Sequence, residues 1–119
     1  MGVYTKGMKY FTPIHIEDLN RKVYFNPSTF QPTVENLRRM ANGSAPIGVD
    51  GVPVTLHHIG QRHNSNLAML TDTFHKQCDE LIHRLPPPKG EQVNRNRFKR
   101  EKRAIWMSIF DWLGVDVRG

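Results

Sequence analysis

The stretch from Pro46 to His83 decides the fold: PIGVDGVPVTLHHIGQRHNSNLAMLTDTFHKQCDELIH. Asp50-Gly51 is typical of a tight hairpin turn, because glycine tolerates the backbone angles that such turns require. Val54 and Leu56 alternate with a threonine, and this alternation predicts a strand that leads directly into a pair of histidines. The centre of the sequence is therefore a turn followed by a strand with two imidazoles at its end.

A second strand and a helix follow this first strand. Residues 66–70, NLAML, predict another short strand. Thr71 or Asp72 then caps a helix that runs to about His83, because both residue types accept hydrogen bonds from the first backbone N–H groups of a helix. The order strand, strand, helix places the end of a hairpin close to the start of a helix.

The sequence before this stretch predicts one further helix. Thr33 is a suitable N-cap, and the helix that it begins ends at Asn42-Gly43, where glycine tolerates a left-handed conformation. Residues 1–32 contain Asn-Pro and Gln-Pro breakers and are expected to be irregular, apart from a β-prone run at 23–25.

A long helix is predicted at the C-terminal end, over 94–113. Its buried stripe is expected to consist of Phe98, Ile105, Trp106, Ile109, Phe110 and Leu113. The chain has 119 residues, which suits a single domain over 1–119 with its core at 46–83.

Composition narrows the possible functions. Hydrophobic residues make up 38% of the chain, which is typical of a globular protein. No apolar run approaches the roughly 20 residues of a membrane-spanning helix, and residues 1–10 show no signal-peptide core. The single cysteine, Cys78, excludes an internal disulfide. The net charge of +6 favours a polyanionic partner, either nucleic acid or an acidic protein.

Histidines gather around the hairpin and the helix that follows it. His57 and His58 end the first strand, and His75 lies in the first turn of the helix. Neighbouring strand residues point to opposite faces, so one histidine of the pair can bind a metal ion while the other faces water and substrate. Phosphodiester hydrolysis needs this division, because a general base must activate water while a cation stabilises charge on the phosphate and the leaving oxygen.

Taken together, these motifs resemble the LHH group of the HNH/endonuclease VII nuclease superfamily. Domains of this group occur at the C-termini of large bacterial polymorphic toxins. The resemblance covers roughly residues 33–106. Its matching segments are 37–40 (LRRM), 45–48 (APIG), 50–51 (DG), 54–61 (VTLHHIGQ), 70–71 (LT), 73–75 (TFH), 82–83 (IH), 94–95 (NR), Phe98 and Trp106. It implies an α+β fold with a ββα-metal (His-Me finger) core, to which the N-terminal and C-terminal helices are added.

The resemblance also implies roles for individual residues. His57 would be a metal ligand, His58 the general base, and His75 the second ligand. Asn66 corresponds to the middle residue of the HNH pattern and would brace the hairpin loop through backbone hydrogen bonds. The LHH pattern favours His83 as third ligand, although it would lie about 12 Å from His75 along a continuous helix.

Helix geometry offers another third ligand. Asp79 is one turn after His75 and shares its face, so it can reach the same ion if the helix is continuous. His83 is the alternative if the helix is broken or starts late. Two or three imidazoles favour Zn²⁺ or Ni²⁺, and Mg²⁺ is the other candidate for the working ion.

Arginines and a glutamine are candidates for contacts with the substrate. Arg39 and Arg38 would hold phosphates, with Arg95 and Arg97 from the basic stretch 95–103. A solvated helix face is the alternative for both basic groups. Gln61, which belongs to the LHH pattern, would orient the loop or the attacking water.

The resemblance predicts a sequence-nonspecific DNase toxin domain, delivered as part of a larger protein, that acts in the cytoplasm of a target cell. Its producer would need an immunity protein, which we expect to be acidic. RNA is the alternative substrate, and a phage or mobile-element endonuclease is an alternative origin. A non-catalytic module with a structural zinc is the rival that is not an enzyme, although such sites usually contain several cysteines.

Overall fold

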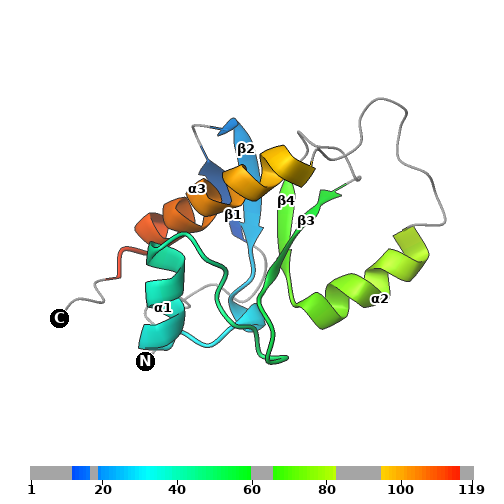
Figure 1. Ribbon diagram of the computed structural model, residues 1–119, viewed down its shortest axis with the longest axis horizontal. Coiled ribbons are helices and arrows are strands. Elements are labelled where there is room, and N and C mark those ends of the chain that lie inside the picture. Colours follow the sequence, from blue (N-terminus) through cyan, green and yellow to red (C-terminus); the bar gives the residue numbers. More distant parts are fainter. Residues whose placement is uncertain (1–11, 17–18, 60–65, 83–94, 116–119) are drawn as a thin grey trace.

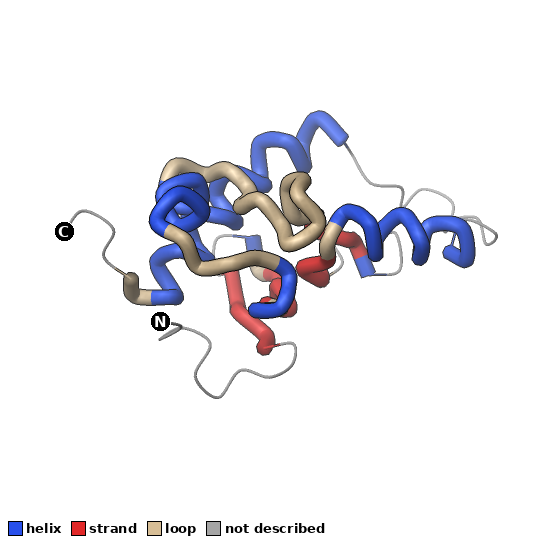
Figure 2. Tube along the Cα trace, turned by 90° about the horizontal axis from the view of Figure 1, so that it is seen from below, coloured by secondary structure: helices blue, strands red, loops and turns tan. Residues whose placement is uncertain are grey.

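The computed structural model describes residues 12–16, 19–59, 66–82 and 95–115, and over 78–82 it describes the backbone alone. A four-stranded sheet lies at the centre, with α3 across it and α1 and α2 towards opposite ends (Figures 1 and 2). In chain order the elements are β1 (Thr12–Ile16), β2 (Arg21–Phe25), the short 3-10 helix η3 (Pro27–Thr29), α1 (Val34–Ala41), β3 (Thr55–His58), β4 (Leu67–Leu70), α2 (Asp72–Ile82) and α3 (Arg95–Leu113).

The sheet has the strand order β1-β2-β4-β3. β3 and β4 pair in antiparallel orientation, with His57 opposite Ala68 and His58 opposite Leu67, and α2 follows directly. The predicted order strand, strand, helix is therefore confirmed, as is the α+β class. Both histidines end β3, as predicted, and β3 lies at an edge of the sheet.

The expectation of an irregular segment over 1–32 is wrong for β1, whereas the β-prone run predicted at 23–25 is confirmed as part of β2. β1 and β2 form an antiparallel hairpin, and β2 pairs in parallel with β4 through Val23 and Leu67. Buried residues alternate along both strands, including Ile14 and Ile16 in β1. Each strand has only five residues and carries charged or breaking side chains, so the local pattern is weak. Pairing with β4, more than 40 positions later, completes the sheet.

α3 covers one face of the sheet and closes the main hydrophobic core. Phe98, Ile105, Trp106 and Ile109 are buried against strand residues, and Phe110 and Leu113 pack partly buried at the margin. The buried stripe predicted for this helix is confirmed. α3 agrees with the predicted range 94–113, whose first residue lies outside the described part of the chain. None of the helices that the structure describes is both long and apolar enough to cross a membrane.

Both predicted ends of α1 are confirmed. The Thr33 hydroxyl accepts a hydrogen bond from the backbone N–H of Asn36 at 3.1 Å, which caps the N-terminus. After Asn42, Gly43 adopts a φ of +84° and ends the helix. A Cβ at Gly43 would collide with the Cγ of Arg103, so the missing side chain also lets α3 approach the end of α1.

Candidate active site

The two histidines of β3 face different parts of the molecule. Burial alternates along the strand: Leu56 and His58 are buried, whereas Thr55 and His57 are half-buried. His57 approaches α2, and His58 packs beneath α3. This alternation is the expected property of neighbouring strand residues. It separates His57, which is open to the gap between β3 and α2, from His58, which is held in the core. His58 is only 5% exposed, so it meets the cleft with little of its surface instead of facing water as expected.

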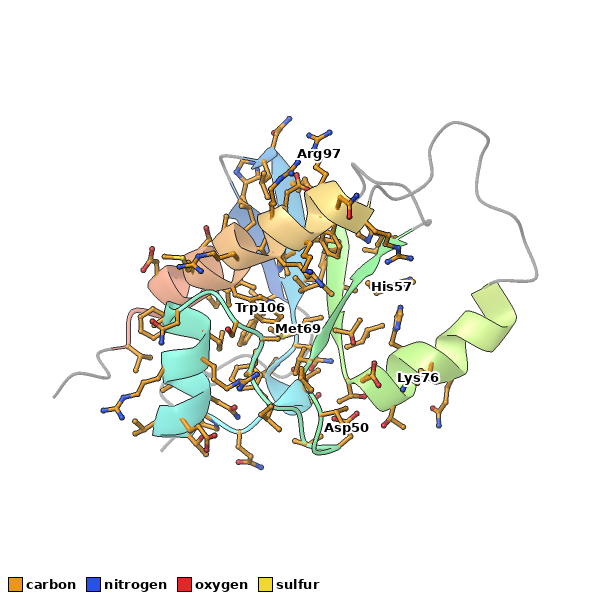
Figure 3. All side chains as sticks on the ribbon, in the orientation of Figure 1. Asp50, His57, Met69, Lys76, Arg97 and Trp106 are labelled. Carbon is orange, nitrogen blue, oxygen red and sulfur yellow. The ribbon has the colours of Figure 1, made fainter. Side chains whose placement is uncertain are left out.

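The half-buried histidine meets a histidine of α2. The ring centroids of His57 and His75 are 5.0 Å apart, with an angle of 60° between the ring planes. Imidazole nitrogens bind zinc at about 2.1 Å, so two rings that share one ion have centroids roughly 4.5–5.3 Å apart. The pair therefore fits the donor chemistry and the spacing of a transition-metal site. Figure 3 shows His57 in the gap between β3 and α2.

Hydrogen bonds fix the start of α2 relative to β3. The Thr71 hydroxyl accepts from the backbone N–H of Phe74 at 3.1 Å and caps the helix. Asp50, in the turn before β3, accepts from the backbone N–H and the hydroxyl of Thr73 at 2.9 and 2.8 Å. The Thr55 hydroxyl donates to the carboxylate of Asp72 at 3.3 Å. These bonds determine where the first turn of α2, with His75, lies beside β3.

The hydrogen bonds from Thr73 favour the ionised form of the Asp50 carboxylate. The hydrogen bond from the backbone N–H of Thr73 lowers the pKa of Asp50 below its ordinary value, and the bond from the Thr73 hydroxyl acts in the same direction. A negative charge at the N-terminus of α2 also interacts favourably with the helix dipole.

The buried histidine is held by an aromatic ring of α3. His58 is 5% exposed, and its ring lies edge-on to Phe98 at a centroid distance of 4.2 Å. The guanidinium carbon of Arg21, in β2, lies 6.0 Å from the centroid of the Phe98 ring. The same guanidinium forms an ion pair with Glu101 at 3.4 Å. Burial lowers the pKa of Arg21, and the charge of Glu101 opposes this shift. Phe98 thus limits the orientations available to the His58 ring.

All three histidines line one cleft with a volume of about 1070 Å³. Its other walls come from the segment 52–56, from the end of α1 and from α3. Five cationic side chains line it as well: Arg39, Arg95, Lys99, Lys102 and Arg103. A cleft that combines imidazoles with excess positive charge can bind a phosphate group and a metal ion next to each other.

A family model described as a nuclease of the HNH/ENDO VII superfamily with conserved LHH matches residues 35–110, more than half of the chain. The chain belongs to this LHH family. The resemblance predicted from the sequence is confirmed, and the protein is a nuclease of this superfamily. The Leu-His-His sequence at 56–58 lies in β3, at the wall of the cleft. No solved structure matches the chain.

Two of the metal-ligand candidates of this LHH nuclease, His57 and His75, are brought together. α2 is continuous to Ile82, which places Asp79 one turn beyond His75 on the helix backbone, the condition under which Asp79 is the favoured third ligand. The side chain of Asp79 and the whole of His83 lie outside the described residues. Within the described part of the chain, no group of three potential ligands is assembled.

Asn66 connects the LHH hairpin with the neighbouring strand. Its backbone carbonyl accepts from the N–H of Ile59 at 3.0 Å, directly after His58. Its side-chain oxygen accepts from the backbone N–H of Lys22 in β2, also at 3.0 Å. The backbone of Asn66 thus braces the end of the hairpin where the connecting segment joins β3 to β4, whereas its side chain bonds to β2.

The structure separates the predicted phosphate-binding residues into two groups. Arg39 and Arg95 line the cleft, and the Nε of Arg39 donates to the carbonyl of Ala45 at 2.8 Å. Arg38 and Arg97 do not line it, and Gln61 lies outside the described residues. Figure 3 shows Arg97 on the side of α3 away from His57, where its Nε is 3.7 Å from Glu101.

Sequence reasoning did not single out three cations that line the cleft. They are Lys99, Lys102 and Arg103, which with Arg95 form a row along α3 that we call the cationic row. Their spacing from Arg95, at four, seven and eight positions, is that of one helix face. This periodicity was the signal in the sequence that could have identified them.

Proposed function

We propose that this LHH nuclease is a metal-dependent endonuclease that cuts bacterial DNA without sequence preference, as the toxin domain of a larger, delivered protein. One observation supports this most directly: the ring centroids of His57 and His75 are 5.0 Å apart, in a cleft that His58 also lines. The cations of the same cleft support a polyanionic substrate.

Two imidazoles, from β3 and α2, would hold the metal ion: His57 and His75. Superfamily members generally use a divalent metal. Bound there, it would neutralise charge that develops on the phosphate and on the departing 3′ oxygen. Asp79 or His83 would complete the ligand set, and zinc titration of Asp79→Ala against His83→Ala distinguishes them by which variant loses affinity. Two nitrogen donors favour Zn²⁺ or Ni²⁺ for binding, with Mg²⁺ as an alternative working ion.

His58 would act as the general base. Its ring lines the cleft, and the edge-on contact with Phe98, at a centroid distance of 4.2 Å, limits its orientation. It would take a proton from a water molecule, whose oxygen then attacks the phosphorus in line with the leaving 3′ oxygen. Histidine suits this role because its ordinary pKa lies near neutrality. Arg39 would hold an adjacent phosphate, with its guanidinium positioned by the Ala45 carbonyl.

The remaining parts of the proposal concern substrate and partners. The cleft residues offer cations for the sugar-phosphate backbone, which carries no base-sequence information, so cleavage would be nonspecific. The net charge of +6 suits an acidic immunity protein that covers the cleft in the producing cell. The fold itself does not discriminate DNA from RNA, and an RNase of the same family is the second candidate.

Cleavage assays test this proposal. Purified protein is incubated with plasmid DNA and with total RNA, each with and without EDTA; we expect metal-dependent cutting of the plasmid only. His58→Ala should bind zinc with unchanged affinity and cleave about 10²–10⁴-fold more slowly, because it lacks the base. His15→Ala, which changes an exposed histidine of β1, is the matched control and should retain full activity.

Each alternative predicts a different result. Preferential cutting of RNA would identify an RNase, and zinc binding without any cleavage would identify a structural module. Unchanged cleavage by His58→Ala would show that His58 is not the base.

A further inference from the structure

The cationic row of α3 lies along one wall of the cleft. Arg95 and Arg103 are eight residues apart, so the row is about 12 Å long at the rise of an α-helix. Phe98, which contacts His58, follows Arg95 by three residues, and the Nζ of Lys102 lies 5.3 Å from the centroid of its ring. Arg103, at the other end of the row, packs over Gly43 at the end of α1. The part of the row around Phe98 therefore lies nearest to His58, and the row ends at α1.

One acidic side chain, Glu101, forms ion pairs on a different face of the same helix. Glu101 pairs with Arg97 at 3.7 Å and with Arg21 at 3.4 Å. Among the residues that the structure describes, no ion pair involves a member of the cationic row. All four members are exposed to solvent. Lys102 also contacts the Phe98 ring, and this contact leaves its charge open to a ligand in the cleft.

The far end of the row is built into the fold. Arg103 packs its side-chain stem over Gly43, where any Cβ would collide with its Cγ. Nearby, Arg39 is fixed by its hydrogen bond to Ala45, and it lines the same cleft. Packing of α1 against α3 thus brings cations from two helices to the end of the cleft that lies away from His58.

On the basis of the nuclease function above, we propose that the cationic row binds consecutive phosphates of one strand of duplex DNA, on one side of the bond that is cut. A length of 12 Å corresponds to roughly three phosphates at an axial spacing of about 3.4 Å per strand. The strand would enter at the histidines and follow α3 towards α1. An acidic protein is the competing ligand for the row, and the test below separates the two.

Salt dependence of DNA binding measures the contribution of each cation. Fluorescence anisotropy of a labelled 20-base-pair duplex, in EDTA to prevent cutting, gives Kd over a range of KCl concentrations. Neutralising one cation that contacts a phosphate should reduce the slope of log K against log salt by about 0.9. We therefore expect Lys99→Gln and Arg103→Gln each to lower the slope by this amount, and the affinity about 5–10-fold near 0.1 M salt.

Arg100→Gln is the matched control, because Arg100 is an exposed arginine of the same helix that does not line the cleft. It should leave the slope unchanged. Equal effects of all three variants would show that overall charge, and not the cationic row, determines binding. No effect of Lys99→Gln and Arg103→Gln on DNA binding would also overturn the proposal, and it would leave an acidic protein as the ligand of the row.

A cleavage map tests the one-sided arrangement. An end-labelled duplex carries three neutral methylphosphonate linkages in one strand. We expect cuts to be suppressed over about three positions on one side of the neutral block, with less asymmetry in Arg103→Gln. Symmetric suppression would contradict the proposed path. If the wild-type protein cuts DNA but the slopes do not change, this inference fails and the endonuclease proposal stands. Slope changes without any cutting would support DNA binding by the row and contradict the endonuclease proposal.

Discussion

Asn36 forms a buried hydrogen-bond network whose removal should destabilise the protein. Its side chain is 6% exposed and bonds to two backbone segments. The amide nitrogen donates to the carbonyls of Gln31 and Ile47 at 2.9 and 3.1 Å, and the amide oxygen accepts from the N–H of Ile47 at 2.8 Å. One side chain thus connects α1 to Gln31, which precedes the helix, and to Ile47, which precedes the turn at Asp50.

The expected loss in Asn36→Ala follows from these three bonds. Each contributes about 0.5–1.5 kcal/mol net, which gives roughly 1.5–4.5 kcal/mol in total. Alanine is the better helix former by about 0.6 kcal/mol, which offsets part of the loss. We expect the free energy of unfolding to fall by about 2–3 kcal/mol.

Urea unfolding followed by circular dichroism measures this difference. Glu35→Ala changes the exposed neighbour on the same helix and should alter the free energy of unfolding by less than about 0.5 kcal/mol. If Asn36→Ala is as stable as Glu35→Ala, the three hydrogen bonds contribute nothing net and this reasoning is wrong.

Two further predictions concern the contacts that position the cleft. Gly43→Ala should be less stable than Gly51→Ala. The two glycines have similar positive φ angles, +84° and +86°, so the backbone strain of an alanine is alike, and only a Cβ at Gly43 meets Arg103. Equal losses in urea unfolding would argue against this contact. Because the pKa of Asp50 is lowered in the folded protein, its bonds to Thr73 stabilise the fold fully at pH values above the ordinary pKa of 3.8. This stabilisation is lost as the pH falls through the lower pKa of the folded state. Unfolding free energies measured from about pH 5 down to pH 3 should therefore decline more steeply for the wild type than for Asp50→Ala, and parallel curves would contradict the assignment.

Local signals in the sequence were sufficient for several elements. Thr33 and Asn42-Gly43 were identified as the two ends of α1, because capping depends on groups only a few residues apart. The buried stripe of α3 follows from helical periodicity alone. The motifs spread over residues 33–106, with Leu-His-His at 56–58 among them, were sufficient to recognise the family, and strand alternation was sufficient to separate the faces of the two histidines.

Other features depend on contacts between distant segments. β1 and β2 are part of the sheet because Val23 pairs with Leu67, and neither five-residue strand has a strong pattern of its own. Asn36 is buried because the segment before the Asp50 turn supplies bonding partners 11 residues away.

The sequence by itself determined what depends on neighbours along the chain: the helix ends, the faces of a strand and the motif of histidines. Only the tertiary structure decided that the cationic row lines the same cleft as the histidines and that His58 packs beneath Phe98, since both depend on how α3 packs against β3. The physical reason is that hydrogen bonds at helix ends and side-chain alternation act over a few residues, whereas packing joins surfaces that are far apart in the chain.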